Sequence, residues 1–181
     1  MRDIIKAGKS VSICTMDDEA KDEYRNMQIN RSLIKSMFND KNFNRIWAEL
    51  LDDSFVCSII ENSTGKICGF VQMMDKESKT PEIGIDIIDG YMSQGYGYES
   101  TKLLIEYYTD NFEIDYFRWK ADTTNKASCA IAKKQGGIMV KEKPFMPQKV
   151  IDTCISNGYM TEEDISYVYI YHIYPRKNVN R

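Results

Sequence analysis

The stretch from Glu82 to Ser100 reads EIGIDIIDGYMSQGYGYES and contains three structural signals in succession. Apolar residues alternate with other residues at its start, which predicts a β-strand over Glu82–Ile88. Two glycines, Gly95 and Gly97, follow in a short loop, and a helix with an apolar stripe begins directly after them. Glycines let the backbone approach a ligand closely, and a helix N-terminus presents unpaired N–H groups to an anion. The stretch therefore predicts a cradle for a phosphate or pyrophosphate group.

Three kinds of phosphate-binding loop combine a strand, a glycine loop and a helix in this order. A nucleoside-triphosphate loop needs the string GxxxxGK[ST], which does not occur in the chain. A dinucleotide-binding loop needs a glycine at position 100, where the chain has Ser100, and it normally lies in a parallel βαβ unit. A coenzyme A loop is the third kind. A lone GxG is also compatible with a simple glycine turn.

The rest of the chain predicts one series of strands and helices without repeats or linkers. Strands are expected at Ser10–Thr15, Phe55–Ile60, Lys66–Met73, Glu82–Ile88, Tyr116–Ala121, Ile138–Lys143 and Ile165–Tyr174. Helices are expected from a capping box of Thr15 and Asp18 to about Met27, within Asn30–Leu51, after Gly97, and over Asn125–Gln135. The meander in the first half does not fit a doubly wound parallel sheet. We expect an α+β fold with a mixed, mostly antiparallel sheet and helices on both faces.

The length of 181 residues favours one domain over residues 1–181, because domains average about 150 residues. A further helix is expected near 147–158, as an insertion before the last strand, with Pro147 where its first turn begins. The last strand is apolar and rich in tyrosine. An exposed edge at this strand would leave room for a homodimer.

The composition is that of a globular protein with a mild negative charge. Its 24 Lys and Arg stand against 27 Asp and Glu, a formal net charge of −3, so we expect no nucleic-acid partner. Five scattered cysteines without a CxxC pair, together with a single histidine, predict no metal site. No apolar run approaches the roughly 20 residues that span a bilayer, and the N-terminus lacks a signal-peptide core. We therefore expect a cytoplasmic protein without membrane contact.

A second motif lies one strand after the first and reads NKASCAIAKKQGG over Asn125–Gly137. Together the two motifs resemble those of the GNAT superfamily of amine N-acetyltransferases, and most closely its branch of ribosomal-protein N-terminal acetyltransferases. That branch has a strand with E-I-G, a loop ending in G-x-G or G-x-A, a helix, a strand, and N-x-x-S ending in K-x-G-F. This chain has, in the same order, Glu82-Ile83-Gly84-Ile85, Gly95-Tyr96-Gly97, Asn125 with Ser128, and Lys134-Gln135-Gly136.

The resemblance implies a GNAT-like acyltransferase fold and acetyl-CoA as cosubstrate. It implies that main-chain groups of strand residues pair with the pantetheine arm as an added strand would, at Ile85, Asp86 and Ile87. Backbone N–H groups of the loop and helix start would bind the pyrophosphate, at Ser93, Gln94, Gly95, Tyr96, Gly97 and Tyr98. Asn125 would touch the coenzyme arm, and helix capping is the other reading of this asparagine.

The implied function is transfer of an acetyl group from acetyl-CoA to a primary amine by direct attack. The acceptor amine would belong to a small molecule or to a protein N-terminus. The alternative is a non-catalytic acyl-CoA-binding or interaction module with the same fold.

Four positions depart from the family pattern. Met92 stands where relatives usually have Gln or Arg, and Gly137 stands where they have an aromatic residue. Ala132 stands where many relatives place a tyrosine acid, and Lys120 where some carry a glutamate base. The commonest catalytic pair is therefore absent, which favours the alternative module.

Amine acetylation needs a group that removes a proton, because an alkyl ammonium has a pKa of about 10. Glu82 is the candidate base, since the resembling branch places a glutamate there; a strand-end carboxylate in solvent is the other reading. Ser128 is the candidate proton donor for the leaving thiolate, and a structural serine in the first helical turn is its other reading. His172, on the last strand among tyrosines, is a weaker candidate base. Its other reading is a packed or surface residue.

Overall fold

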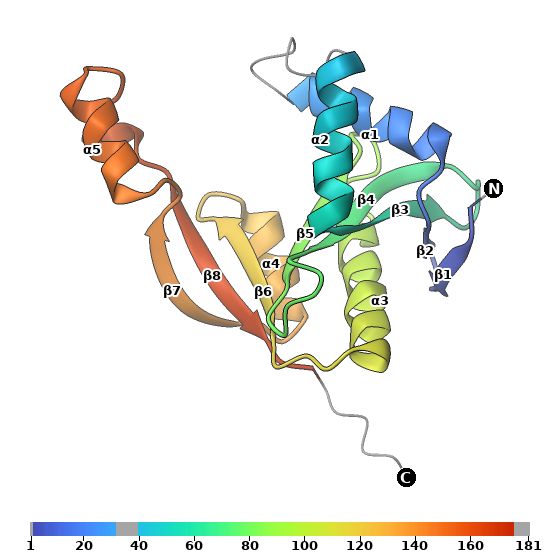
Figure 1. Ribbon diagram of the computed structural model, residues 1–181. Helices are drawn as coiled ribbons and strands as arrows, with labels where there is room; N and C mark the ends of the chain where they lie inside the picture. Colours follow the sequence, from blue (N-terminus) through green and yellow to red (C-terminus); the bar gives the residue numbers. More distant parts are fainter. Residues whose placement is uncertain (1, 32–39, 176–181) are drawn as a thin grey trace. The chain divides into compact units, whose positions relative to one another are not determined.

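The computed structural model describes residues 2–31 and 40–175 and divides into two compact units, Met1–Asp115 and Tyr116–Arg181 (Figure 1). Each unit contains its own strands and helices. The strand pairings within each unit are antiparallel.

Five strands form the sheet of the first unit, in the spatial order in which they follow one another along the chain. They are β1 (Ile4–Ala7), β2 (Val11–Cys14), β3 (Phe55–Glu61), β4 (Ile67–Met74) and β5 (Glu82–Ile87). The last four confirm strands that the sequence predicts, within one or two residues at each end. The sequence pattern did not predict β1, since none of its four residues is buried.

Helices cover both faces of this sheet. α1 (Asp18–Arg31) and α2 (Asp40–Asp53) lie on one face and α3 (Tyr96–Asn111) on the other (Figure 1). On the first face, the ring of Tyr24 in α1 meets that of Phe70 in β4 edge-on, with centroids 5.2 Å apart. On the second face, Phe55 of β3 stacks on Tyr107 of α3 at 5.6 Å. α2 confirms one of the one or two further helices expected within Asn30–Leu51, and it runs on to Asp53. α1 ends at Arg31 rather than near Met27, and residues 32–39 lie outside the described residues.

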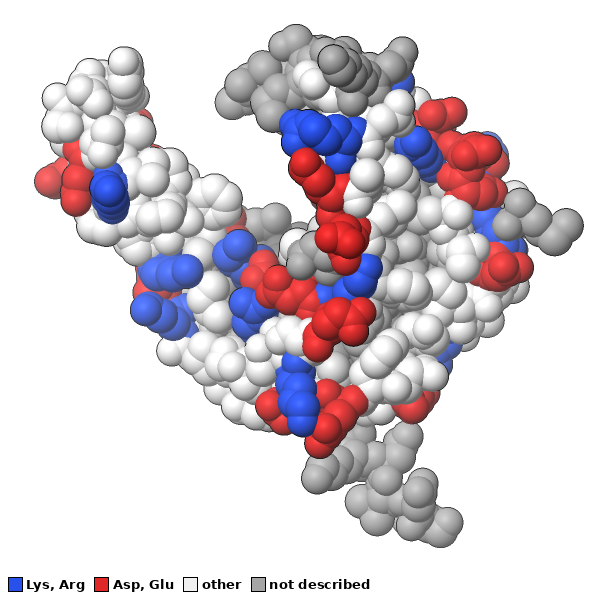
Figure 2. All heavy atoms as spheres, in the orientation of Figure 1, with Lys and Arg blue, Asp and Glu red and all other residues white. Residues whose placement is uncertain are grey.

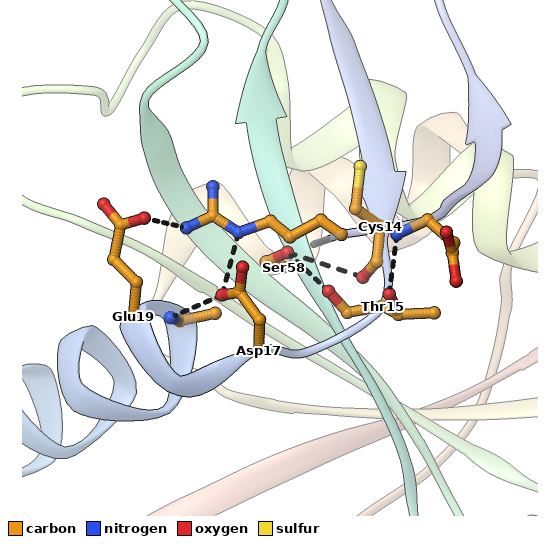
Figure 3. Close-up of polar contacts among 8 residues, drawn as sticks. Cys14, Thr15, Asp17, Glu19 and Ser58 are labelled. Atoms are coloured by element: carbon orange, nitrogen blue, oxygen red, sulfur yellow. Dashed lines mark hydrogen bonds and ion pairs between the residues drawn. The ribbon is translucent and has the colours of Figure 1, made fainter.

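The N-terminus of α1 is capped by Asp17, which corrects the expected capping box (Figure 3). The Asp17 carboxylate accepts a hydrogen bond from the backbone N–H of Ala20 at 3.0 Å and pairs with Arg2 at the same distance. The backbone bond and the arginine together lower the pKa of Asp17. The hydroxyl of Thr15 instead accepts from the backbone N–H of Asp3, which joins the start of the chain to the end of β2.

Three strands form the sheet of the second unit, in the order β6 (Phe117–Asp122), β8 (Tyr167–Ile173), β7 (Ile138–Pro144). The last strand of the chain therefore lies between two partners, and the expectation that it offers an exposed edge is wrong. The outer strand is β7. β8 begins at Tyr167 rather than at Ile165, because Ile165 is the C-cap of a short 3-10 helix over Glu162–Asp164.

Two helices belong to the second unit. α4 (Lys126–Lys134) packs on β6 and β8, and α5 (Gln148–Ser156) is the helix expected near 147–158, with Pro147 as its N-cap. The α+β class with a mostly antiparallel sheet and helices on both faces is confirmed. The single domain over residues 1–181, with α5 as an insertion, stays a prediction.

In the part of the chain that the structure describes, no helix combines the length and apolar character needed to cross a membrane. Within the same residues, no three His, Cys, Asp or Glu side chains gather where they could hold a metal ion.

Candidate functional site

The loop between β5 and α3 has a backbone conformation that requires glycine at two positions. The φ angles of Gly90, Ser93 and Gly95 are 94°, 63° and 84°, in the left-handed region that other residues seldom adopt. A Cβ atom added at Gly90 or Gly95 would meet nothing within 4 Å, so conformation rather than crowding requires glycine. Gly95 directly precedes α3, and no side chain caps this helix. The first turn of α3 therefore has backbone N–H groups without a side-chain cap, directly after the exposed loop residues Met92–Gly95.

A hydrogen-bonded clamp holds the start of α3 to the β3–β4 hairpin. The Tyr96 hydroxyl donates to one Glu61 carboxylate oxygen at 2.5 Å, and the Thr64 hydroxyl donates to the other, also at 2.5 Å. These two bonds lower the pKa of Glu61, and the bond to Glu61 raises the pKa of Tyr96 to about 12. Sequence reasoning missed this clamp, because Glu61 and Tyr96 are 35 positions apart and neither residue lies in a pattern with the other.

A second contact from the same helix reaches the N-terminal strands. The Glu99 carboxylate, in the first turn of α3, accepts a hydrogen bond from the backbone N–H of Ser10 at 2.9 Å. The helix start is therefore tied to two separate connections of the sheet.

Strand β5 carries its polar residues on the face that α1 and α2 cover. Asp86 lies opposite Phe70 in the β4–β5 register, and Glu82 lies opposite Met74. Glu82, Gly84 and Asp86 therefore share one face of the strand. Glu82 starts the strand, and the glycine loop follows its other end, about 20 Å away at 3.3 Å per residue.

Between the two carboxylates lies the side chain of Gln72. A Cβ on Gly84 would stand 2.7 Å from the Gln72 amide nitrogen and 2.8 Å from its Cγ, so glycine leaves the room that this side chain occupies. The Gln72 amide oxygen is buried without a hydrogen-bond partner among the described residues. Sequence reasoning missed Gln72, since it lies on β4 outside both motifs.

The second motif forms a connected set of contacts in the second unit. The Asn125 side-chain oxygen accepts from the backbone N–H of Ser128 at 3.0 Å and so caps α4. The Ser128 hydroxyl accepts from the indole N–H of the buried Trp119 at 3.0 Å. Because this bond uses an oxygen lone pair, the Ser128 O–H is still able to donate. Trp119 was not singled out from the sequence, although it orients the candidate serine.

One of the four positions that depart from the family pattern has a structural reason. A Cβ on Gly137 would stand 2.7 Å from the Ala132 carbonyl oxygen, so an aromatic residue is excluded there without a backbone shift. Ala132 itself is fully buried, Met92 is exposed, and the Lys120 ammonium lies 5.8 Å from the centre of the Phe145 ring.

His172 lies in an aromatic stack rather than among groups that would make it a base. Its ring stacks on Tyr116 with centroids 4.0 Å apart and meets Tyr174 edge-on at 6.5 Å. This arrangement fits the packed reading of the histidine.

The family described as "Acetyltransferase (GNAT) domain" has a sequence model that matches residues 12–138 of this chain. No curated protein sequence matches the chain.

Solved structures match nearly the whole chain at low sequence identity. RimL, a ribosomal L7/L12 alpha-N-protein acetyltransferase in complex with coenzyme A, is 13% identical with a TM-score of 0.73, over 95% of this chain and 98% of that one. The microcin C7 self-immunity acetyltransferase MccE, in complex with acetyl-CoA and AMP, is 18% identical with a TM-score of 0.68, over 92% and 93%. A dodecameric spermidine N-acetyltransferase from Vibrio cholerae is 10% identical with a TM-score of 0.71, over 96% and 99%. At these identities the likeness shows the fold.

Proposed function

The chain belongs to the GNAT acetyltransferase family, and from this premise we propose that it transfers an acetyl group from acetyl-CoA to a primary amine by direct attack. The observation that carries the proposal is the uncapped start of α3, which follows a loop with two glycines at positive φ. Backbone N–H groups at a helix N-terminus favour an anion such as a pyrophosphate. Two of the similar solved structures contain coenzyme A or acetyl-CoA.

The residues present fit this cosubstrate. Backbone N–H groups from Ser93 to Tyr98 would hold the pyrophosphate, and the main chain of Ile85–Ile87 would pair with the pantetheine arm. In the second unit, Asn125 caps α4 and would contact coenzyme A as well. Acetyl-CoA supplies the activated thioester carbonyl.

Two side chains would move protons in this reaction. Glu82 would take a proton from the acceptor ammonium, directly or through a water molecule, so that a neutral amine attacks the carbonyl carbon. Ser128 would donate its hydroxyl proton to the departing thiolate, from a position that its bond with Trp119 holds. The attacking nitrogen loses its second proton, which restores the Ser128 hydroxyl through water. The products are the acetylated amine, free coenzyme A and one proton on Glu82. Glu82 lies in the first unit and Ser128 in the second, and each role is proposed by itself.

Calorimetric titration with acetyl-CoA tests the proposal. We expect binding in the micromolar range, and a thermal melt at 100 times the dissociation constant should gain about 2.7 kcal/mol of stability. Absence of binding up to millimolar acetyl-CoA would overturn the cosubstrate assignment and leave only the family fold.

The clamp between Glu61 and Tyr96 leads to a second prediction. Tyr96→Phe keeps the ring and removes the hydroxyl, so the first residue of α3 loses its tie to the hairpin. We expect acetyl-CoA affinity to fall about fivefold, the effect of one net hydrogen bond. Tyr107→Phe, further along the same helix and outside the loop, is the matched comparison for a general effect of hydroxyl removal. Equal affinities for Tyr96→Phe and the unaltered protein would mean that the clamp does not shape the loop.

A second candidate function is a non-catalytic acyl-CoA-binding or interaction module. It is favoured by Ala132 and Lys120, which stand where relatives carry an acid and a base. Release of free thiol from acetyl-CoA, measured with a panel of amines, separates the two functions. A module binds the thioester without amine-dependent turnover.

The finer properties of the protein are also proposals. We propose one acetyltransferase domain over residues 1–181 and a cytoplasmic location, which the five free cysteines favour because thiols persist in a reducing compartment. A homodimer is proposed as well and is tested by sedimentation. The acceptor class, small molecule or protein N-terminus, is addressed below.

A further inference from the structure

One face of the β6–β8–β7 sheet carries four cationic side chains. In the antiparallel register, Lys120 of β6 and Lys141 of β7 both lie opposite Ile170 of β8, so the three residues share a row and a face. Two residues along each outer strand, the same face carries Arg118 and Lys143. We call this surface, made by Arg118, Lys120, Lys141 and Lys143 around Ile170, the basic face.

The opposite face of the same sheet is the one that α4 covers. Trp119 and Tyr171 point to that side, and the indole of Trp119 bonds to Ser128 of α4. The basic face is therefore the side of the sheet that lies away from α4. Lys120, Lys141 and Lys143 are exposed there, and Figure 2 shows Lys and Arg atoms gathered over β6, β7 and β8.

Two of the four cations on the basic face have no ionic partner among the described residues. Lys141 and Lys143 form no ion pair with any described residue. Asp122 lies on the same face at the end of β6, and its carboxylate accepts from the backbone N–H and hydroxyl of Thr124 at 2.8 and 2.6 Å. It is the one acidic residue on this face of β6, against the two cations Arg118 and Lys120. Residues 116–181 carry 11 Lys and Arg against 6 Asp and Glu, a formal excess of five positive charges in a chain whose total is −3.

The spacing of the lysines matches an extended polypeptide. Lys141 and Lys143 are two residues apart on one strand, about 6.8 Å, and alternate side chains of an extended peptide have the same spacing. Ile170 and the exposed ring of Phe145 supply apolar surface beside the lysines. Pro144 lacks an N–H group and the ladder is irregular between Met139 and Lys141, which oppose the addition of a strand along the edge. A partner would therefore lie across the face and contact side chains.

We propose that the basic face binds an acidic, extended segment of a polypeptide acceptor; this rests on the proposed acetyltransferase function. Lys141 and Lys143 select the complementary negative charge of such a segment. A polypeptide is favoured over a nucleic acid, because the spacing of Lys141 and Lys143, about 6.8 Å, is that of alternate side chains in an extended peptide.

Binding is measured by fluorescence anisotropy with a labelled, N-acetylated octapeptide of alternating Glu and Ser. We expect binding that weakens as salt increases, and at least a tenfold loss in the double variant Lys141→Glu, Lys143→Glu. The matched control is Lys133→Glu, Lys149→Glu, which makes the same charge change on α4 and α5 and should bind like the unaltered protein. Equal losses in both double variants, or equal binding of a Gln-Ser octapeptide, would overturn the proposal. Tighter binding of a single-stranded oligonucleotide of equal charge would also overturn it.

Turnover with two peptides links the face to the reaction. A peptide with a free N-terminal Ser followed by alternating Glu and Ser should have a KM at least tenfold below that of its Gln counterpart. The Lys141→Glu, Lys143→Glu variant should lose this difference while its acetyl-CoA affinity is unchanged. Loss of acetyl-CoA binding in the unaltered protein would refute the proposed function, whereas equal KM values with intact acetyl-CoA binding would refute only the role of the basic face.

Discussion

Gly97→Glu should abolish acetyl-CoA binding while the protein stays folded. Gly97 is buried in the first turn of α3, directly after the loop that is proposed to hold the pyrophosphate. A carboxylate about 4 Å from a phosphate charge costs about 4 kcal/mol at an effective dielectric constant of 20, which corresponds to a loss of more than 100-fold. The helix itself should persist, because glutamate forms helices better than glycine and interacts favourably with a helix N-terminus.

Calorimetry measures the acetyl-CoA affinity of the variant, and a thermal melt shows whether the variant is folded. Gly97→Gln has nearly the same size without the charge, so it should lose less affinity and separate bulk from electrostatic repulsion. Thr153→Glu places the same residue on the exposed surface of α5 and should bind acetyl-CoA normally. Normal binding by folded Gly97→Glu would remove the loop from the proposed site.

Local pattern in the sequence was sufficient for the elements around the candidate site. The β5–α3 stretch could be predicted because strand alternation, glycines at positive φ and a helical stripe all lie within neighbouring residues. The cap of α1 could not, since Thr15 and Asp17 both suit a helix start, and the contact of Thr15 with Asp3 decided between them.

Contacts between distant residues account for what the sequence did not predict. The position of β8 between β6 and β7 depends on pairing across more than 20 residues of chain, so an apolar final strand looked like an edge. The Glu61–Tyr96 clamp and the place of Gln72 over Gly84 likewise need the β3–β4–β5 register.

The distribution of charge over the surface also depends on contacts between distant residues. The net charge of −3 is the sum of a positive second unit and a negative first one. The alternation of Lys141, Glu142 and Lys143 shows that the lysines share a face of β7, but only the pairing of β7 with β8 shows which face of the sheet this is. Once β8 pairs with both neighbours, lysines from separate strands share a face. The overall acidity therefore said little about what this part of the surface would bind.

Glu82→Gln should lower kcat by about 100-fold, the lower range of the contribution that a general base makes. The substitution keeps the shape of the side chain and removes its ability to accept a proton, while the backbone of β5 remains available to the pantetheine arm. Acetyl-CoA affinity should therefore stay within about twofold of the unaltered protein, a change below 0.5 kcal/mol. Steady-state turnover and calorimetry on the same preparation measure both quantities.

The loss of a general base also changes how the rate depends on pH. Without a base only amine that is already neutral reacts, so the rate of the Glu82→Gln variant should keep rising toward the amine pKa of about 10 and approach that of the unaltered enzyme there. Glu113→Gln removes the same charge from an exposed pair with Lys79 and should leave turnover unchanged at every pH. If Glu82→Gln has the kcat and pH profile of the unaltered enzyme, Glu82 is not the base. Neutral amine would then have to come from the solution equilibrium, and positioning of the two substrates would provide most of the rate enhancement.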